Sequence, residues 1–318
     1  MFPDGIARMC GSKLRVSGVM SKKTELQADL QRIGYLLAGS HKTQESRSGT
    51  FRTFAWAMRA TNFGIHCAAQ IGGKHLQAFV DHRLGSGIAS RTIDKEMGHL
   101  RAVLRHIGKQ GLADNPAYSN RALGIAQGCR KGTKEPLSDA EIRSFQQRAE
   151  RLGRPDIGAI LEMQRALGLR ELEVIRAGRS DTLLRLHREL TERGCARMIE
   201  GTKGGRMRDV HPADVGRALA AVQRAREILE ASGRRYLLAC AKGVETKDLK
   251  QAASVYRKFC SRAGLQSHAA RYAFAQERMQ AYRNAGLSQR EARIATSLDL
   301  GHGDGRGRYV ANVYARDS

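Results

Sequence analysis

Several separate segments of the chain place a basic side chain, a histidine or a tyrosine where it could act on a phosphate group. In the first segment, Gly168 allows a sharp turn, Arg170 follows it, and Glu173 lies three residues further on. The planar donor fork of an arginine matches two phosphate oxygens, and a neighbouring carboxylate can orient that fork. Taken alone, the spacing is more typical of an exposed Arg–Glu pair.

The next two segments add cations at a turn and at the start of a helix. Lys203 stands beside two glycines, and a lysine on a short rigid loop can enter a minor groove and deliver a proton. His268 and Arg271 are three residues apart, so they share one face of a first helical turn. Helix N-termini favour anions, so a cationic pair there is easier to explain if a phosphate binds nearby. A solvated lysine and a polar helix start are the plainer interpretations.

The last two segments are a glycine-rich loop and a pair of tyrosines. His302 follows a glycine directly after a predicted helix, and the glycines around it lack the spacing of a nucleotide-binding fingerprint. With Asp304 as its only acid, the loop is not a calcium loop either. Tyr309 and Tyr314 follow, and a phenol needs surrounding positive charge to become a nucleophile at neutral pH. A core aromatic with an exposed hydroxyl is the plainer interpretation of each.

The charge of the whole chain points to a polyanionic partner. The 318 residues include 55 Lys+Arg against 31 Asp+Glu, a formal net charge of +24. The surplus is divided evenly, with 21 basic against 9 acidic residues before residue 136 and 34 against 22 from there on. Two basic domains that grip one polyanion fit this distribution better than a basic tail does. Nucleic acid is the first expectation, an anionic membrane surface the second, and a merely solvated basic face the third.

The cysteines and the apolar runs indicate the cellular compartment in which the protein is expected to work. The six cysteines show neither CxxC pairs nor histidines at zinc-ligand spacing, so we expect reduced thiols in a cytoplasmic protein without a metal site. No apolar run is long enough to span a bilayer.

The first half of the chain predicts a helical domain. We expect a loose extension over residues 1–20, a small helical bundle over 21–128 and a basic linker over 129–136. Apolar periodicity predicts helices within Thr24–Leu37, Phe51–Met58, His75–Leu84 and Ser90–Ile107. Ser90 is the expected cap of the last helix, and the stretch from Leu112 to Pro116 is expected to stop it.

Residues 137–318 predict a second, mostly helical domain with one strand pair. Ser138 with Glu141 and Ser288 with Glu291 form capping-box patterns, and Ser267 resembles a further cap. Short alternating runs at Ala196–Ile199 and Met207–His211, joined through a Gly-Gly turn that carries Lys203, predict a hairpin.

Taken in order, these segments resemble the tyrosine recombinase (phage integrase) family. The resemblance rests on Gly168-Leu169-Arg170 with Glu173, Lys203 in a hairpin, His268-x-x-Arg271, Leu300-Gly301-His302 and a terminal tyrosine, and it covers essentially the whole chain. It implies a fold that is mainly α with a small β-hairpin or sheet. A helical core DNA-binding domain would precede an α+β catalytic domain.

The resemblance also implies roles for single residues. Arg170 and Arg271 would clamp the scissile phosphate, with Glu173 in support, and Lys203 would protonate the leaving 5′ oxygen. His268 would assist proton transfer with the nucleophile, and His302 would hold the phosphate and support the tyrosine. Tyr314 would attack to give a 3′-phosphotyrosyl bond, without metal, ATP or another cofactor. The partner would be double-stranded DNA, with two protomers on a site and four in a synapse. We expect DNA contacts from Arg91, Lys95, Arg130, Lys131 and Lys134.

Two alternatives to this interpretation stay open. The family usually places its tyrosine nine to ten residues after the box histidine, whereas Tyr309 is seven and Tyr314 twelve residues after His302. The intervening glycines suggest a longer loop and favour Tyr314. A type IB topoisomerase shares the chemistry, and a decayed integrase could bind DNA without cutting it.

Overall fold

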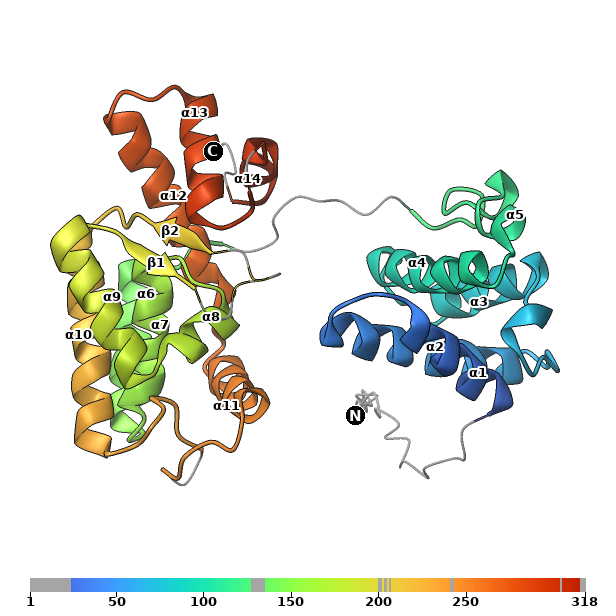
Figure 1. Cartoon of the computed structure of the whole chain (residues 1–318), viewed down its shortest axis with the longest axis horizontal. Coiled ribbons are helices and arrows are strands. Elements are labelled where there is room, and N and C mark those ends of the chain that lie inside the picture. The colour runs from blue at the N-terminus through green and yellow to red at the C-terminus, as the bar shows by residue number, and fades with distance from the viewer. Residues whose placement is uncertain are drawn as a thin grey trace, which may run out of the picture. The chain divides into compact units, whose positions relative to one another are not determined.

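The protein is described by a computed structural model over residues 24–126, 135–199, 202, 205, 207–240, 243–303 and 305–314. The chain divides into two compact units, one up to residue 129 and one from residue 130 (Figure 1). Across the described residues the chain is mainly helical, with a single two-stranded antiparallel sheet, which confirms the predicted fold class. Within the same residues no helix combines the length and the apolar character needed to cross a membrane.

The N-terminal unit is an all-helical bundle around an apolar core. Its elements are α1 (Glu25–Leu36), α2 (His41–Ala60), η1 (Ala68–Gln70), α3 (Gly73–Gly85), α4 (Ser90–His106), α5 (Gln110–Ala113) and η2 (Pro116–Tyr118). The rings of Phe54 and Phe79 meet edge to face in the core, with their centroids 5.2 Å apart. All four predicted helices are present, because the 3.6-residue period places their apolar side chains on one buried face.

Two local predictions for this unit were wrong. Ala89, not Ser90, is the N-cap of α4, and Ser90 is already helical, so its hydroxyl lies one position too late to cap. The short helix α5 occupies residues 110–113 and so includes the first two residues of the stretch from Leu112 to Pro116, where the sequence predicted a stop. The stop comes just after it, where the side chain of Asn115 accepts a hydrogen bond from the Ala117 N–H (2.9 Å).

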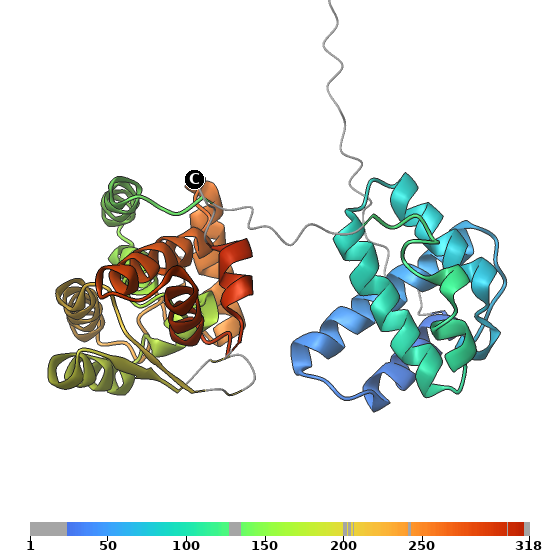
Figure 2. The same ribbon diagram turned by 90° about the horizontal axis from the view of Figure 1, so that it is seen from above.

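Over its described residues, the second unit places the strand pair among nine α-helices and carries its candidate site where several of them meet. Its elements are α6 (Asp139–Arg151), α7 (Pro155–Ala166), α8 (Glu171–Ala177), α9 (Ser180–Arg193), β1 (Ala196–Met198), β2 (Arg208–Val210), α10 (Val215–Ser232), α11 (Leu249–Arg262), α12 (His268–Asn284), α13 (Gln289–Asp299) and α14 (Gly307–Val313). The central helix α7 packs against α6, α10 and α12. Helix α13 lies against both α12 and α14 (Figure 1 and Figure 2).

The predicted hairpin is present as β1 and β2, which pair with Ala196 opposite Val210 and Met198 opposite Arg208. Of its turn, Lys203, Gly204 and Arg206 lie outside the described residues.

Two of the three predicted helix caps of this unit are present and one is not. The boxes at Ser138 and Ser288 are confirmed, since each hydroxyl accepts from the amide three residues on and each glutamate side chain accepts in return. Ser267 precedes α12 but does not cap it, because its backbone is already helical (φ −52°, ψ −33°) and its side chain accepts no capping hydrogen bond.

Candidate active site

The turn after α7 positions Arg170. Gly168 has φ +59°, a backbone conformation that is strained for any residue with a side chain. A Cβ at this position would also collide with the ring of Phe274. Arg170 is the N-cap residue of α8, and its backbone N–H donates to Glu173 Oε2 (2.8 Å). Its Nη1 donates to Glu173 Oε1 (2.6 Å), so the expected Arg170–Glu173 contact is present. Its Nη2 donates to the carbonyl oxygens of Leu300 and Gly301, both at 3.1 Å.

Arg271, in the first turn of α12, is fully buried. Its Nη1 donates to the carbonyl oxygen of Gly168 and its Nη2 to that of Leu300. Its Nε donates to the hydroxyl of Tyr314 (3.3 Å). The guanidinium groups of Arg170 and Arg271 therefore share one carbonyl oxygen, although 101 positions separate them in the sequence.

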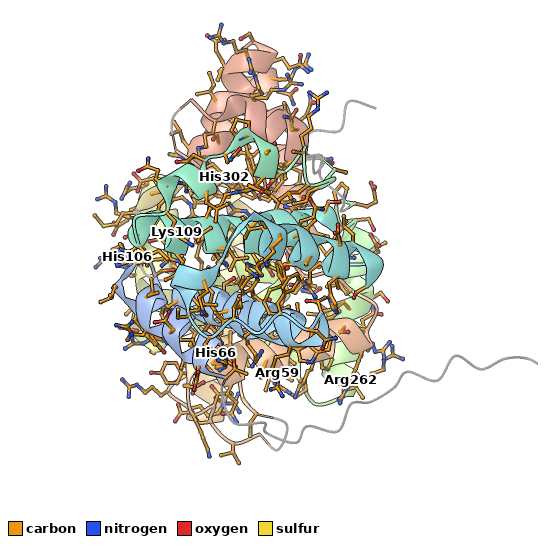
Figure 3. All side chains as sticks on the ribbon, turned by 90° about the vertical axis from the view of Figure 1, so that its right-hand side faces the viewer. Arg59, His66, His106, Lys109, Arg262 and His302 are labelled. Atoms are coloured by element: carbon orange, nitrogen blue, oxygen red, sulfur yellow. The ribbon has the colours of Figure 1, made fainter. Side chains whose placement is uncertain are left out.

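The two candidate tyrosines lie in different surroundings. Tyr314 is 2% exposed, and its hydroxyl is also 3.2 Å from Nε2 of His302 (labelled in Figure 3). Tyr309 is 40% exposed, and its ring lies on that of His302 with centroids 4.6 Å apart. The hydroxyl of Tyr314 thus lies among the arginine and histidine side chains.

His268 approaches this group from α12. Its half-buried ring meets the edge of Tyr272, with centroids 5.8 Å apart, and the Tyr272 ring in turn contacts Tyr314 at 4.6 Å. The spacing of His268 and Arg271 predicted one shared helical face. Both lie in the first turn of α12, where Arg271 is completely buried and His268 is partly exposed.

A third arginine, which the sequence analysis missed, completes the cluster. Arg208 of β2 donates through Nη1 and Nη2 to the two carboxylate oxygens of Glu173, at 3.0 and 2.7 Å. Burial by itself would raise the pKa of Glu173, but the hydrogen bonds and charge of Arg208, with the charges of Arg170 and Arg271, lower it to about 2. Three arginines around one carboxylate leave two positive charges uncompensated at neutral pH.

A neighbouring acid does not cancel this surplus. Asp299 is buried, and its carboxylate accepts from Arg278 (3.1 Å) and Tyr282 (2.9 Å) and contacts the imidazole of His211 (2.8 Å). The contact with Asp299 raises the pKa of His211. Asp299 is therefore matched by a cation of its own, and the excess around Glu173 stays available to an anion.

The same charges keep His302 neutral. Burial, followed by the positive charges of Arg271, Arg170 and Arg208, lowers the pKa of its imidazole to about 3. At neutral pH the ring is therefore unprotonated and can accept a hydrogen bond, and Nε2 faces the Tyr314 hydroxyl. The arrangement joins a phenol, a neutral acceptor and fixed cations, which suits attack on an anionic phosphorus centre.

Comparison with known families agrees with this chemistry. The sequence profile of the phage integrase N-terminal domain matches residues 20–113, and the integrase profile matches residues 124–277. The chain belongs to the tyrosine recombinase (phage integrase) family. No curated protein is significantly similar to it in sequence.

Several solved integrase structures share the fold. A lambda integrase tetramer bound to a Holliday junction matches with a TM-score of 0.59 at 15% identity, over 92% of this chain and 78% of that chain. A lambda integrase dimer bound to a COC′ core site gives 0.58 at 15% identity, over 92% and 77%. The Tn1549 transposon integrase in complex with transposon right end DNA gives 0.61 at 15% identity, over 93% and 96%.

The remaining predicted site residues of this integrase-family chain are surface or undescribed positions. Arg91 and Lys95 are exposed one turn apart on α4. Lys203, Arg130, Lys131 and Lys134 lie outside the described residues. Among the residues that the structure does describe, no group of three His, Cys, Asp or Glu side chains is placed to hold a metal ion.

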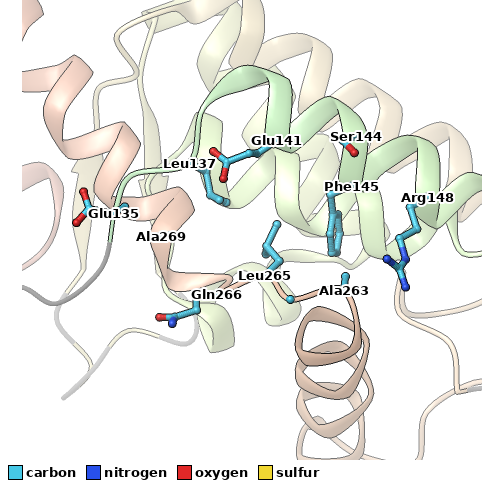
Figure 4. A pocket seen from close by; sticks show the side chains of 11 residues that line it. Glu135, Leu137, Glu141, Ser144, Phe145, Arg148, Ala263, Leu265, Gln266 and Ala269 are labelled. Carbon is cyan, nitrogen blue, oxygen red and sulfur yellow. The ribbon is translucent and has the colours of Figure 1, made fainter.

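Charge and contacts, not cavity size, single out this site. A separate pocket of about 450 Å³ lies between α6 and the connection from α11 to α12 (Figure 4). Its lining includes Leu137, Phe145 and Leu265 but neither Arg271 nor Tyr314.

Arg208 could have been found from the sequence, because the period of two in a strand puts it on the same face as the apolar Val210.

Proposed function

We propose that this chain is a site-specific DNA recombinase that cuts and rejoins DNA through a 3′-phosphotyrosyl intermediate. The observation that carries the proposal is the Tyr314 hydroxyl, 3.2 Å from His302 Nε2 and 3.3 Å from Arg271 Nε, inside a cluster with surplus positive charge. Such a phenol can lose its proton to a neutral imidazole while fixed cations stabilise the phosphate that it attacks.

In the proposed step, the Tyr314 oxygen forms a bond to the scissile phosphorus, and the bond from phosphorus to the 5′ oxygen breaks. The phenolic proton passes to His302, which is unprotonated without DNA and becomes a stronger base once the negative charge of the phosphate lies beside it. Lys203 protonates the leaving 5′ oxygen. Attack by the 5′ hydroxyl of the partner strand then reverses every transfer. The phosphodiester energy stays in the protein–DNA bond, so the reaction needs neither ATP nor a metal.

Arg170 and Arg271 hold the non-bridging oxygens, where negative charge builds in the transition state. Arg271 has no exposed surface, so the groups that cover it must move before DNA can reach its guanidinium. The side chain of Arg170 is 22% exposed and offers the first contact. His268, whose ring contacts that of Tyr272, assists the transfer of the phenolic proton.

The partner in this proposal is double-stranded DNA, met in the cytoplasm. Support comes from the net charge of +24 and from the exposure of Arg91 and Lys95 on α4. Linker residues Arg130, Lys131 and Lys134 add phosphate contacts in the proposal. Because the lambda structures are a DNA-bound dimer and a tetramer on a Holliday junction, we propose pairs on a site and four protomers in a synapse. The phage and transposon relatives favour a mobile element as the source of the DNA.

The test is covalent trapping on a nicked DNA fragment that carries the element's own ends. We expect a denaturation-resistant adduct with the parent and with Tyr309→Phe, and none with Tyr314→Phe. Mapping the DNA end should place the protein on the 3′ phosphate and leave a free 5′ hydroxyl. Loss with Tyr309→Phe alone would reassign the nucleophile. Specific binding without any adduct would favour a non-catalytic DNA-binding protein, and relaxation of supercoils without strand exchange would favour a type IB topoisomerase.

A further inference from the structure

Arg208 makes hydrogen bonds to two parts of the site at once. Besides its two hydrogen bonds to Glu173, its Nε donates to the backbone carbonyl oxygen of Asp299 (2.8 Å), at the C-terminal end of α13. The side chain is only 6% exposed, and the carboxylate of Glu173 is fully buried. Phosphate therefore has little direct access to Arg208, which sets it apart from Arg170.

The glycine of the Leu300-Gly301-His302 motif is explained by Arg208. Gly301 has φ +65°, and a Cβ at this position would come within 2.7 Å of Arg208 Cδ and 3.1 Å of its Nε and Nη1. Both the backbone conformation and the space next to it exclude a side chain. The loop that carries His302 therefore packs directly on the guanidinium end of Arg208.

These contacts close a ring that joins the two halves of the site. Arg208 holds Glu173, Glu173 holds Arg170, and Arg170 donates to the carbonyl oxygens of Leu300 and Gly301. The chain then leads back through Asp299 to Arg208. Two arginines, Arg170 and Arg208, hydrogen-bond to the carboxylate of Glu173. Without Arg208 the ring is open, and Arg170 is the one of the two that stays bonded.

We propose that Arg208 is a positioning residue, which fixes the separation between Arg170 on α8 and the loop that carries His302. The inference rests on the proposed function, because the distance that it fixes is the one a scissile phosphate would have to fit. A misplacement of about 1 Å is enough to slow a reaction about 100-fold. The forked geometry is what the role requires, since a lysine could supply the charge but not two carboxylate bonds and a carbonyl bond together.

The test compares Arg208→Met and Arg208→Lys with Arg154→Met in the full chain. Arg154 makes the same pattern of contacts in the same unit, two hydrogen bonds to the Asp156 carboxylate and one to a carbonyl oxygen, all at 2.9 Å. We expect single-turnover adduct formation at saturating DNA to fall about 100-fold in both Arg208 variants and to stay within about threefold of the parent in Arg154→Met. The lysine variant keeps the charge of Arg208 but not its shape, so it separates the two. The charge of Arg208 contributes to the low pKa of His302. Only the methionine variant should therefore shift the acid limb of the pH–rate profile to higher pH.

Hydrogen exchange provides a measurement that needs no catalysis. In Arg208→Met, amide exchange should rise about tenfold in two segments distant in sequence, residues 168–174 and 298–303, while Arg154→Met leaves both unchanged. Unchanged exchange in Arg208→Met, or a rate equal to that of the parent, would overturn the inference. If the parent forms no adduct, the proposed function fails, and the exchange pattern alone decides whether Arg208 positions these segments.

Discussion

Two buried carboxylates, Glu96 in the N-terminal unit and Glu173 in the second unit, lie under opposite electrostatic conditions. In the N-terminal unit, buried Glu96 pairs with Arg83 through two hydrogen bonds of 2.9 and 2.8 Å. In the second unit, Glu173 meets Arg170 and Arg208 directly, with Arg271 close enough to lower its pKa further. The first pair is neutral as a whole, whereas the second group retains two positive charges.

This difference separates a pair that serves the fold from a cluster that can take an anion. A matched buried pair stabilises a structure without a ligand, whereas an uncompensated buried charge is unfavourable until an anion binds. The N-terminal unit displays cations such as Arg91 and Lys95 on its surface, where they act over a wide area. The second unit gathers Arg170 and Arg208 around Glu173, with Arg271 beside them and bonded to the Tyr314 hydroxyl.

The largest expected effect is on catalysis. Arg271→Met removes a fixed donor from the proposed transition state, so adduct formation should fall by about 10²- to 10³-fold in single-turnover assays. The matched control is Arg165→Met, which removes another buried arginine of the second unit, one paired with Glu277 outside the cluster. Equal losses in the two folded variants would mean that burial of an arginine, rather than its place in the cluster, decides the rate.

Next in size is an effect on stability. Glu173→Gln leaves three arginines facing one another and should lower the free energy of unfolding by about 3–5 kcal/mol. Glu96→Gln affects a single arginine and should cost less. Urea unfolding can separate the units, because Trp56, the only tryptophan, lies in the N-terminal one.

The pH dependence of that stability difference has a definite sign. The folded pKa of Glu173 is about 2, below its ordinary value of 4.5, so its contribution is present above pH 4.5 and is lost as the pH falls toward 2. The difference between the parent and Glu173→Gln should shrink over that window. A difference that stays constant between pH 5 and pH 2 would contradict the assigned charge state.

The smallest effect concerns DNA contacts of the N-terminal unit. Replacing both Arg91 and Lys95 by alanine should reduce the slope of log affinity against log salt by about 1.8, since each phosphate contact contributes about 0.9. Fluorescence anisotropy across a salt series measures that slope. A slope equal to that of the parent would remove α4 from the proposed DNA interface.

Local sequence signals predicted the elements well and the site only in part. Periodicity and capping boxes located α1, α4 and α13, because these features depend on neighbours within one or two turns. The caps at Ser90 and Ser267 failed, since a single backbone conformation decides whether a hydroxyl can reach an amide. No local pattern is decisive at that level.

Contacts across the fold were beyond such signals. Arg208 bonds to residues 35 and 91 positions away, so nothing near it in the sequence pairs it with Glu173 or Asp299. Spacing likewise left Tyr309 and Tyr314 as alternatives. The fold distinguishes them by exposure, 40% against 2%, and by which hydroxyl reaches Arg271.

The central claim is that the surplus positive charge in the second unit exists to neutralise a scissile phosphate. The most direct measurement compares the parent with Arg271→Met on DNA whose scissile linkage is either a normal phosphodiester or an uncharged methylphosphonate. On the phosphodiester, the parent should form the adduct about 10²- to 10³-fold faster than the variant. On the uncharged linkage there is less charge to stabilise, so the ratio should fall toward about 1. A ratio that is equally large on both linkages would show that Arg271 serves the fold rather than the phosphate.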